Sequence, residues 1–343
     1  MKGSNALKLA VMLLAGVVAL WPQTGLTQAK ANFTARIGHL EAPTQSRHQG
    51  LLKIAKLVSE RTNGDVDLQI FDSSKLGNQS QMTEGTQFGT IEGTVSPAAF
   101  LGGFNPVVSI LDIPYLYPTS RTASQKLREG PFGKAILDSF SSRGMVALSI
   151  WPNGRKSMTS NRPLSNLDAY KGQKFRVMDS KILQEQFVAV GAFAVSIAFG
   201  ELYTALQTGV VDGQENPLDT IATMKYHEVQ KNLVVTEHGV MEDIVLFNAV
   251  WWKSLPANYR QVIANAFDEV RPEIEKTKEA AQQVALDTIR KAGVKVRTAD
   301  ETERQGLGQA MYAKSKAAFL ELAGAEGVKV VAIYEAELKR VGN

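Results

Sequence analysis

Two short stretches of the chain repeat one pattern of glycine, acidic and proline residues. Residues 87–97, QFGTIEGTVSP, and residues 207–217, QTGVVDGQENP, share the glutamine, both glycines, the acidic position and the final proline. Each follows a helix-like run, and Gly89 and Gly209 stand where a helix C-cap is expected. A short strand then ends at a proline, which cannot extend strand pairing. The repeat predicts two similarly built α/β parts that deliver strand ends to one crevice, with a chance match as the alternative.

The segments around the first copy alternate between strand-like and helix-like patterns. This order predicts a parallel sheet with right-handed crossovers. The expected elements are a strand over residues 33–40, a helix over 49–64, a strand over 65–71, a helix from about 79, and further strands over 144–151 and 174–179.

A long charged segment, residues 257–292, predicts a helix that is kinked at Pro272 and long enough to cross more than one lobe. No low-complexity linker separates the lobes, so several crossings and hinge motion are expected. The predicted fold class is therefore α/β, with two lobes and a ligand cleft between them. We assign residues 30–153 and about 242–280 to lobe I, and residues 154–241 and about 281–343 to lobe II.

The N-terminus has the three-part layout of a secretory signal peptide over residues 1–29. Lys2 and Lys8 accompany the apolar run at residues 9–21, and a small-residue site follows. The run is short for a membrane span, although an uncleaved anchor is the alternative. Two of the 38 basic residues lie in this segment, and the others nearly balance the 34 acidic residues. We expect a periplasmic protein, and nothing points to a nucleic-acid partner.

The composition excludes several kinds of chemistry. The chain has no cysteine, so it has neither disulfides nor thiolate chemistry. The four histidines, His39, His48, His227 and His238, show no metal-ligand spacing. There is no nucleophile elbow, phosphate loop or dinucleotide fingerprint. We therefore expect no metal, no cofactor and no enzymatic activity.

Two arginines near predicted strand ends are the most informative polar residues. Arg155 follows the strand at residues 144–151, and Arg176 lies between Phe175 and Val177. An arginine in a strand either points to solvent by alternation or lines a polar cavity, and the pattern alone leaves both open. Its planar fork matches a carboxylate with two parallel hydrogen bonds, which lysine cannot reproduce.

Three motifs in one order carry a family resemblance: YKGQKFRVMDS, AFGELYTALQTGVVDGQENPL and YHEVQKNLVVTEHGV. With them, the chain from about residue 33 to its end resembles the substrate-binding proteins of tripartite ATP-independent periplasmic (TRAP) transporters, of the dicarboxylate-binding type. The resemblance implies a monomeric receptor for a small organic acid that serves the small and large membrane subunits of such a transporter. An exported enzyme acting on organic acids and a sensory adaptor are the alternatives.

The resemblance also implies roles for particular residues. Arg176 matches the family's carboxylate clamp, Arg155 a second arginine near the hinge, Asn216 the asparagine before the proline, and Phe199 a pocket aromatic. Ser96, Pro97 and Ala98 form the strand end that varies between subfamilies.

The remaining candidates come from the loops that surround the crevice. Glu41, His48 and Asp243 are expected at the far end of the ligand, and Trp151 is expected either in a pocket wall or in the core. Glu215 would repel an acid unless it is turned away or paired. Dicarboxylates, 2-oxo acids, sugar acids and aromatic acids all remain possible ligands.

Overall fold

A computed structural model describes residues 31–341; the predicted signal peptide lies outside them. The strands are β1 Phe33–Gly38, β2 Val66–Phe71, β3 Gly93–Pro97, β4 Met145–Ser160, β5 Lys174–Val177, β6 Phe193–Ser196, β7 Gly213–Pro217, β8 Asn232–Val235, β9 Val240–Asn248 and β10 Lys295–Thr298. The helices are α1 Ser46–Arg61, α2 Gln79–Phe88, α3 Arg121–Glu129, α4 Pro131–Asp138, α5 Lys181–Val188, α6 Leu202–Gln207, α7 Leu218–Thr223, α8 Ala249–Ser254, α9 Ala257–Lys291 and α10 Glu301–Val341.

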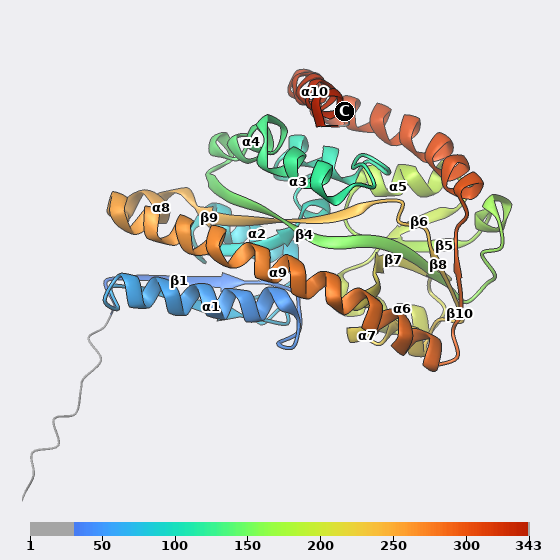
Figure 1. The fold of residues 1–343 in the computed structure, drawn as a ribbon, viewed down its shortest axis with the longest axis horizontal. Coiled ribbons are helices and arrows are strands. Elements are labelled where there is room, and N and C mark those ends of the chain that lie inside the picture. The colour runs from blue at the N-terminus through green and yellow to red at the C-terminus, as the bar shows by residue number, and fades with distance from the viewer. Residues whose placement is uncertain (1–30, 342–343) are drawn as a thin grey trace, which may run out of the picture. The chain divides into compact units, whose positions relative to one another are not determined.

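The strands form two groups that share β4. The first strand group has the order β2-β1-β3-β9-β4, and the second has the order β4-β7-β5-β6, with β8 pairing with both β4 and β10. Residues Met145 to Arg155 of β4 pair with β9, and residues Lys156 to Ser160 pair with β7. A single strand therefore carries the chain from one group into the other (Figure 1).

The two copies of the sequence repeat form equivalent strands. β3 and β7 each span five residues and end at a proline, Pro97 and Pro217. Each pairs parallel with one neighbour and antiparallel with the long strand beside it: β3 with β1 and β9, and β7 with β5 and β4. The predicted pairing of similarly built parts is confirmed. The parallel sheet predicted around the first copy is confirmed as well, because β1 pairs parallel with both β2 and β3, and β9 and β4 extend that sheet with antiparallel pairing.

The strand predicted over residues 144–151 is much longer in the structure. β4 continues through Pro152 and Gly154, and its register with β9 shifts between these two residues. Such a shift accommodates one extra residue, here Asn153, and redirects the side chains that follow. The predicted end of this strand at residue 151 is therefore wrong, because Pro152 still pairs with β9 and Asn153 is accommodated as the extra residue.

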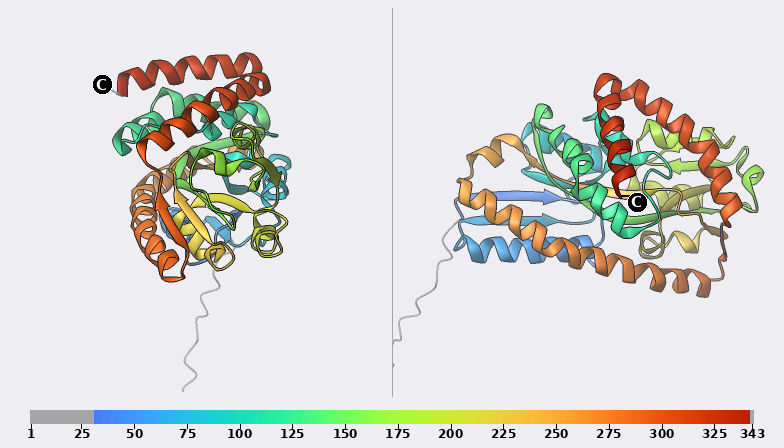
Figure 2. Two further views of the ribbon diagram at one scale, coloured as in Figure 1. Left: turned by 90° about the vertical axis from the view of Figure 1, so that its right-hand side faces the viewer. Right: turned by 45° about the horizontal axis from the view of Figure 1, so that its top comes forward.

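The long helix predicted near residue 257 is α9, which continues through Pro272. It packs on α1 of the first strand group and on α7 of the second, as Figures 1 and 2 show. Its contact with α1 is close because Gly50 faces Ile274, whose Cδ1 atom would lie 2.3 Å from any Cβ at that position. One helix thus contacts both strand groups, as the sequence predicts.

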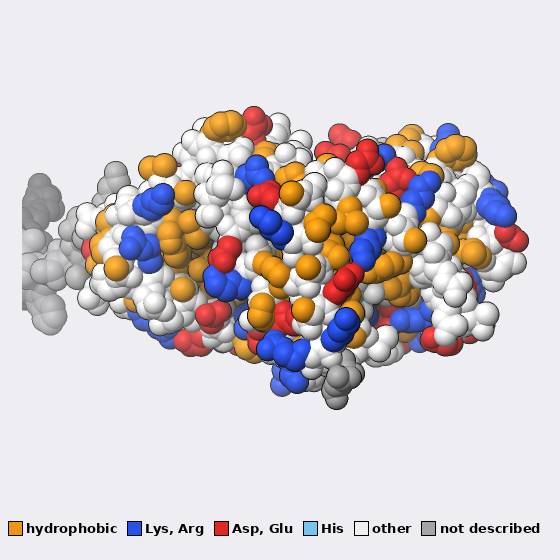
Figure 3. Space-filling view, turned by 90° about the horizontal axis from the view of Figure 1, so that it is seen from above, with side chains coloured by type: hydrophobic (Ala, Val, Ile, Leu, Met, Phe, Trp, Pro, Cys, Tyr) orange, Lys and Arg blue, Asp and Glu red, His pale blue; other side chains and the backbone are white. Residues whose placement is uncertain are grey.

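The C-terminal helix, α10, covers α4 and α5. It also packs on the 3-10 helix Pro106–Asp112, and it bends at Gly324, where the backbone leaves the helical region. Figure 3 looks onto this side, where basic, acidic and hydrophobic side chains are interspersed. No helix among residues 31–341 is both long enough and apolar enough to span a membrane.

Candidate ligand-binding site

Two adjoining cavities lie where the two strand groups face each other. The outer one has a volume of about 180 Å³ and the inner one about 20 Å³, and they share Leu40, Phe100 and Phe199. The inner cavity is lined by Leu40, Glu41, Arg47, Pro97, Phe100, Asn153, Met178, Phe199, Asn216, Thr220 and Met241. A water molecule needs about 10–15 Å³ of such space, so the inner cavity must widen to admit an organic acid.

Arg176 lies on β5, beneath the floor of these cavities. It is in register with Gln214 of β7, which places both side chains on the face that carries Asn216. Met178, two residues further along, lines the inner cavity, and Ile197, whose carbonyl accepts from Arg176 Nε at 2.8 Å, lines the outer one. Arg176 itself lines neither of these two cavities.

The guanidinium of Arg176 is buried and has no counter-ion among residues 31–341. The residue is 1% exposed, and its Nη2 atom has no hydrogen-bond partner among the described residues. Burial lowers the pKa of Arg176 to about 10, and the neighbouring Tyr226 and Glu215 only partly offset that effect. A buried cation without an anionic partner is costly, so this position is suited to a ligand carboxylate.

Asn216 is held in place by a chain of buried side-chain hydrogen bonds. Its Nδ2 donates to Gln214 Oε1 at 2.5 Å, and Gln214 Nε2 donates to Thr159 Oγ1 at 2.9 Å. Thr159 in turn donates to Gln230 Oε1 at 2.8 Å. The second hydrogen of the Asn216 amide remains available, and the chain fixes the direction in which it points.

Glu215 points to the opposite face of β7. It accepts from Lys156 Nζ at 2.8 Å, from Gln186 Nε2 at 2.5 Å and from the His238 ring at 2.5 Å. Burial acts to raise the pKa of Glu215, but Lys156 and His238 outweigh it and bring the pKa to about 2. Glu215 is therefore turned away from the ligand side and paired, which is the condition under which it would not repel an acid, and its cationic partner is a lysine.

The first strand group contributes a cluster of buried charges. Arg47 pairs with Asp243 and with Glu41 Oε1, the latter at 3.4 Å. Lys278 of α9 lies 2.9 Å from Glu41 Oε1 and 2.7 Å from Asp219 Oδ2. Because Asp219 lies on α7 and Glu41 follows β1, one lysine connects the two sides of the site.

Four other predicted site residues do not line the inner cavity: Ser96, Ala98, His48 and Asp243. Pro97 lines it, whereas the Ser96 side chain donates to the Pro97 carbonyl and Ala98 packs in a hydrophobic core. The ring of His48 contacts His39, with 3.1 Å between their nitrogens. Asp243 does not reach the cavity itself, but its carboxylate accepts hydrogen bonds from Arg47 and Asn153, which do.

Trp151 belongs to the core. It is 1% exposed and packs against Phe267, with ring centroids 5.6 Å apart. Of the two possibilities left open by the sequence, core packing is the one observed.

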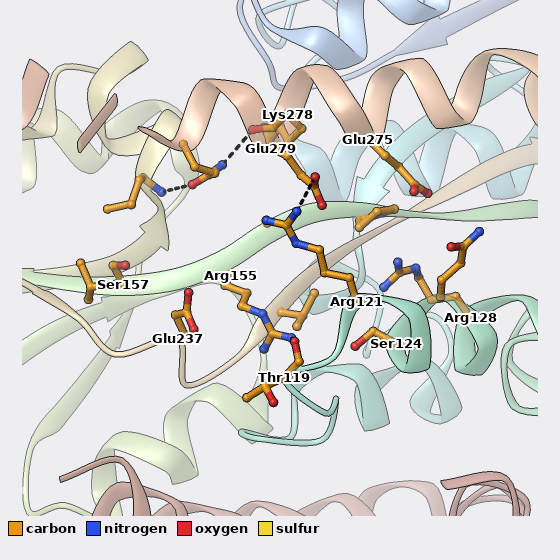
Figure 4. A pocket seen from close by; sticks show the side chains of 17 residues that line it. Thr119, Arg121, Ser124, Arg128, Arg155, Ser157, Glu237, Glu275, Lys278 and Glu279 are labelled. Atoms are coloured by element: carbon orange, nitrogen blue, oxygen red, sulfur yellow. Dashed lines mark hydrogen bonds and ion pairs between the residues drawn. The ribbon is translucent and has the colours of Figure 1, made fainter. Parts of the chain in front are cut away.

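Arg155 is directed away from the other candidates. Its Nη2 donates to the Pro118 carbonyl at 2.6 Å, and it lines a separate cavity of about 360 Å³ between α3, β4 and α9. Figure 4 shows Arg155 in this cavity with Arg121 and Arg128. Alternation along β4 turns Lys156 toward Glu215 instead. Arg155 thus lies where β4 passes from one strand group to the other, and it lines neither of the two adjoining cavities.

Sequence reasoning missed Arg47, Asn153 and Lys278. The predicted helix began at residue 49, whereas α1 begins at Ser46 and so includes Arg47. Asn153 lies beyond the strand predicted over residues 144–151, and Lys278 is one of many charged residues in the segment predicted as a long helix. The run of polar residues at positions 41–48 was the only signal for this side of the site.

A family model described as bacterial extracellular solute-binding protein, family 7, matches residues 37–322. The chain is 32% identical to the C4-dicarboxylate-binding periplasmic protein DctP of Rhodobacter capsulatus over 82% of its own length and 84% of the relative's. It belongs to this solute-binding family, and the predicted resemblance to TRAP-transporter binding proteins is confirmed.

Solved structures agree in fold. A TRAP periplasmic solute-binding protein from Desulfovibrio salexigens with bound orotic acid is 62% identical, with a TM-score of 0.89 over 90% of this chain and 99% of that one. A second from Sulfurospirillum deleyianum, with bound succinate, is 29% identical, with a TM-score of 0.81 over 88% and 99%. The two-lobed α/β class is therefore confirmed, and the chain is a solute-binding receptor of the TRAP type.

Proposed function

We propose that this protein binds one small organic acid by its carboxylate at Arg176 and delivers it to the small and large membrane subunits of a TRAP transporter. The observation that supports this proposal is a guanidinium that is buried and has no carboxylate partner among residues 31–341. A ligand carboxylate would supply the missing partner with two parallel hydrogen bonds. Asn216, fixed by Gln214, would orient the same carboxylate.

The ligand would be enclosed by movement of two lobes. We keep the division into residues 30–153 with about 242–280, and 154–241 with about 281–343. The exchange of β4 between strand groups at Arg155 and Lys156 supports a crossing there. Opening would widen the inner cavity, and closing would bring Phe100 and Phe199 against the bound acid.

Orotate is the first ligand to test. The Desulfovibrio salexigens protein, at 62% identity, holds orotic acid in its structure. Phe100 and Phe199 are shared by both cavities and would give a flat ring apolar surfaces on which to pack. We propose that the acid is released unchanged, and that the protein acts in the periplasm as a monomer after removal of residues 1–29.

A thermal-shift screen of orotate, succinate, malate, galactonate and galacturonate tests this function. An acid at ~100 times its dissociation constant stabilises the folded protein by roughly 2.7 kcal/mol. Small-angle scattering with the best acid should give a smaller radius of gyration than the empty protein, and mass spectrometry should recover the acid unaltered. The proposal fails if no acid raises the melting temperature, or if a product accumulates.

A further inference from the structure

We infer that Glu41, Arg47 and Asn153, here called the far wall, recognise an uncharged end of the ligand that presents an N–H group beside a carbonyl. The ligand would then carry a single negative charge, held at Arg176. The inference rests on the proposed function, because it places the carboxylate at that arginine. It adds the chemistry of the other end, which selects between classes of acid.

In each residue of the far wall, one polar side-chain atom bonds to a neighbouring residue, and at least one other polar atom has no hydrogen-bond partner among the described residues. Arg47 uses Nη2 for Asp243 and Glu41, and its Nη1 and Nε have no partner among the described residues. Glu41 Oε1 accepts from Lys278, and Glu41 Oε2 has no hydrogen-bond partner among the described residues. Asn153 donates from Nδ2 to Asp243 at 2.9 Å, and its Oδ1 has no partner in residues 31–341. All three residues line the inner cavity.

The donor and acceptor identity of these free atoms is fixed by their neighbours. Burial acts to raise the pKa of Glu41, but Arg47 and Lys278 outweigh it and bring the pKa to about 2, so Glu41 only accepts. A carboxylate cannot donate to an amide oxygen, so Asp243 holds the NH₂ group of Asn153 and leaves its oxygen free. The far wall therefore offers two acceptors beside the two donor nitrogens of Arg47.

The charge balance of the far wall leaves no positive charge for a second anion. Arg47 and Lys278 are surrounded by three buried carboxylates, those of Glu41, Asp219 and Asp243. A second carboxylate on the ligand would face the ionised Glu41 Oε2 in a desolvated space. Arg176, in contrast, has no ion-pair partner among the described residues. The site can neutralise one ligand charge but not two.

The complementary ligand is an acid whose opposite edge alternates N–H and C=O groups. An imide edge donates to Glu41 or Asn153 and accepts from Arg47, whereas a dicarboxylate offers only acceptors. The ring of orotate has such an edge. The far wall therefore predicts a preference different from that named for the C4-dicarboxylate-binding relative of Rhodobacter capsulatus.

Calorimetry with three acids separates the classes in the unmodified protein. Orotate has one carboxylate and an imide edge, benzoate has one carboxylate and no polar edge, and fumarate has two carboxylates. We expect benzoate to bind about 10- to 100-fold more weakly than orotate, as is typical when charged hydrogen-bonding groups are left unpaired. Fumarate should bind at least as weakly as benzoate. Fumarate binding as tightly as orotate would overturn the inference, and no binding by any acid would defeat the proposed function as well.

Glu41→Gln tests the key acceptor, with Glu84→Gln on the exposed side of α2 as the matched control. The Glu41 variant should weaken orotate about 10- to 100-fold and shift the fumarate-to-orotate affinity ratio at least tenfold toward fumarate. Benzoate should change less than threefold, and the control variant should change none of the three. An equal loss of affinity for all three acids would refute the inference. If the Glu41 variant does not fold, the order of affinities of the three acids for the unmodified protein decides the question alone.

Discussion

Replacing Arg176 with methionine should separate the empty protein from its complex. The side chain is buried, and within the described part of the chain only its Nε atom is hydrogen-bonded, to the Ile197 carbonyl. Methionine has a flexible apolar chain that can fill much of the same space. The variant therefore removes an uncompensated charge from the empty protein and a ligand-binding group from the complex.

The expected gain in the empty protein follows from the pKa of Arg176. Burial lowers that pKa to about 10, which corresponds to about 3 kcal/mol of lost stability relative to a solvated guanidinium. Because the folded pKa lies below the unfolded one, the full penalty acts at every pH below about 10 and fades as the pH rises through the unfolded value. Losing the bond to Ile197 costs about 1 kcal/mol. Arg176→Met should thus stabilise the empty protein by about 2 kcal/mol at neutral pH.

Ligand binding should change in the opposite direction. Removing one member of a buried charge pair costs ~2–5 kcal/mol, or roughly 30-fold to several-thousand-fold in affinity. Arg176→Lys keeps the charge but loses the planar fork, so it should also bind weakly. Arg155→Met, in the cavity behind β4, is the matched control and should retain ligand affinity.

Differential scanning fluorimetry measures the stability of the empty variant, and calorimetry measures its ligand affinity. Circular dichroism is the folding control. A higher melting temperature for empty Arg176→Met, together with loss of the shift on adding acid, is the expected result. If the variant binds the acid as well as the unmodified protein, the carboxylate is held elsewhere. If the empty variant is several kcal/mol less stable, Arg176 is a structural residue.

Two further predictions concern stability. Burial raises the pKa of Asp112 to about 7, so the folded chain holds a proton that the unfolded chain loses near pH 4, and stability falls as the pH rises between these values. Asp112→Asn, which can still accept from Ser180, should raise the melting temperature more at pH 8 than at pH 5; equal shifts would contradict this pKa. Gly213→Ala should strongly destabilise the protein, because the new Cβ would lie 2.2 Å from the Thr159 carbonyl oxygen. Urea unfolding measures this effect. An unchanged midpoint would show that β7 and β4 can move apart to make room for the methyl group at no cost in stability.

The sequence predicted the architecture well because its signals are local. The repeated pattern placed β3 and β7 correctly, and Gly89 ends α2 with a left-handed backbone, as a C-cap requires. The position of Glu215 on the opposite face from Asn216 follows from the two-residue period of a strand. Repeats, caps and alternation can all be recognised in neighbouring residues.

The candidate site was harder to predict because it brings together segments that are distant in the sequence. It also depends on which face of a strand each side chain occupies. Arg155 enters a separate cavity and Lys156 pairs with Glu215, which the neighbouring residues in the sequence do not predict. Arg47 is separated by 196 residues from Asp243, and Lys278 by 237 residues from Glu41. No local pattern predicts which distant charges will meet, or which of their atoms remain free.

Comparing orotate with uracil by calorimetry tests the central claim most directly, because uracil is the same ring without the carboxylate. If Arg176 holds the carboxylate, orotate should bind at least about 30-fold more tightly than uracil, the lower end of what a buried charge pair contributes. Equal affinity for the two compounds would contradict carboxylate recognition at Arg176, and failure of both to bind would remove orotate as the ligand.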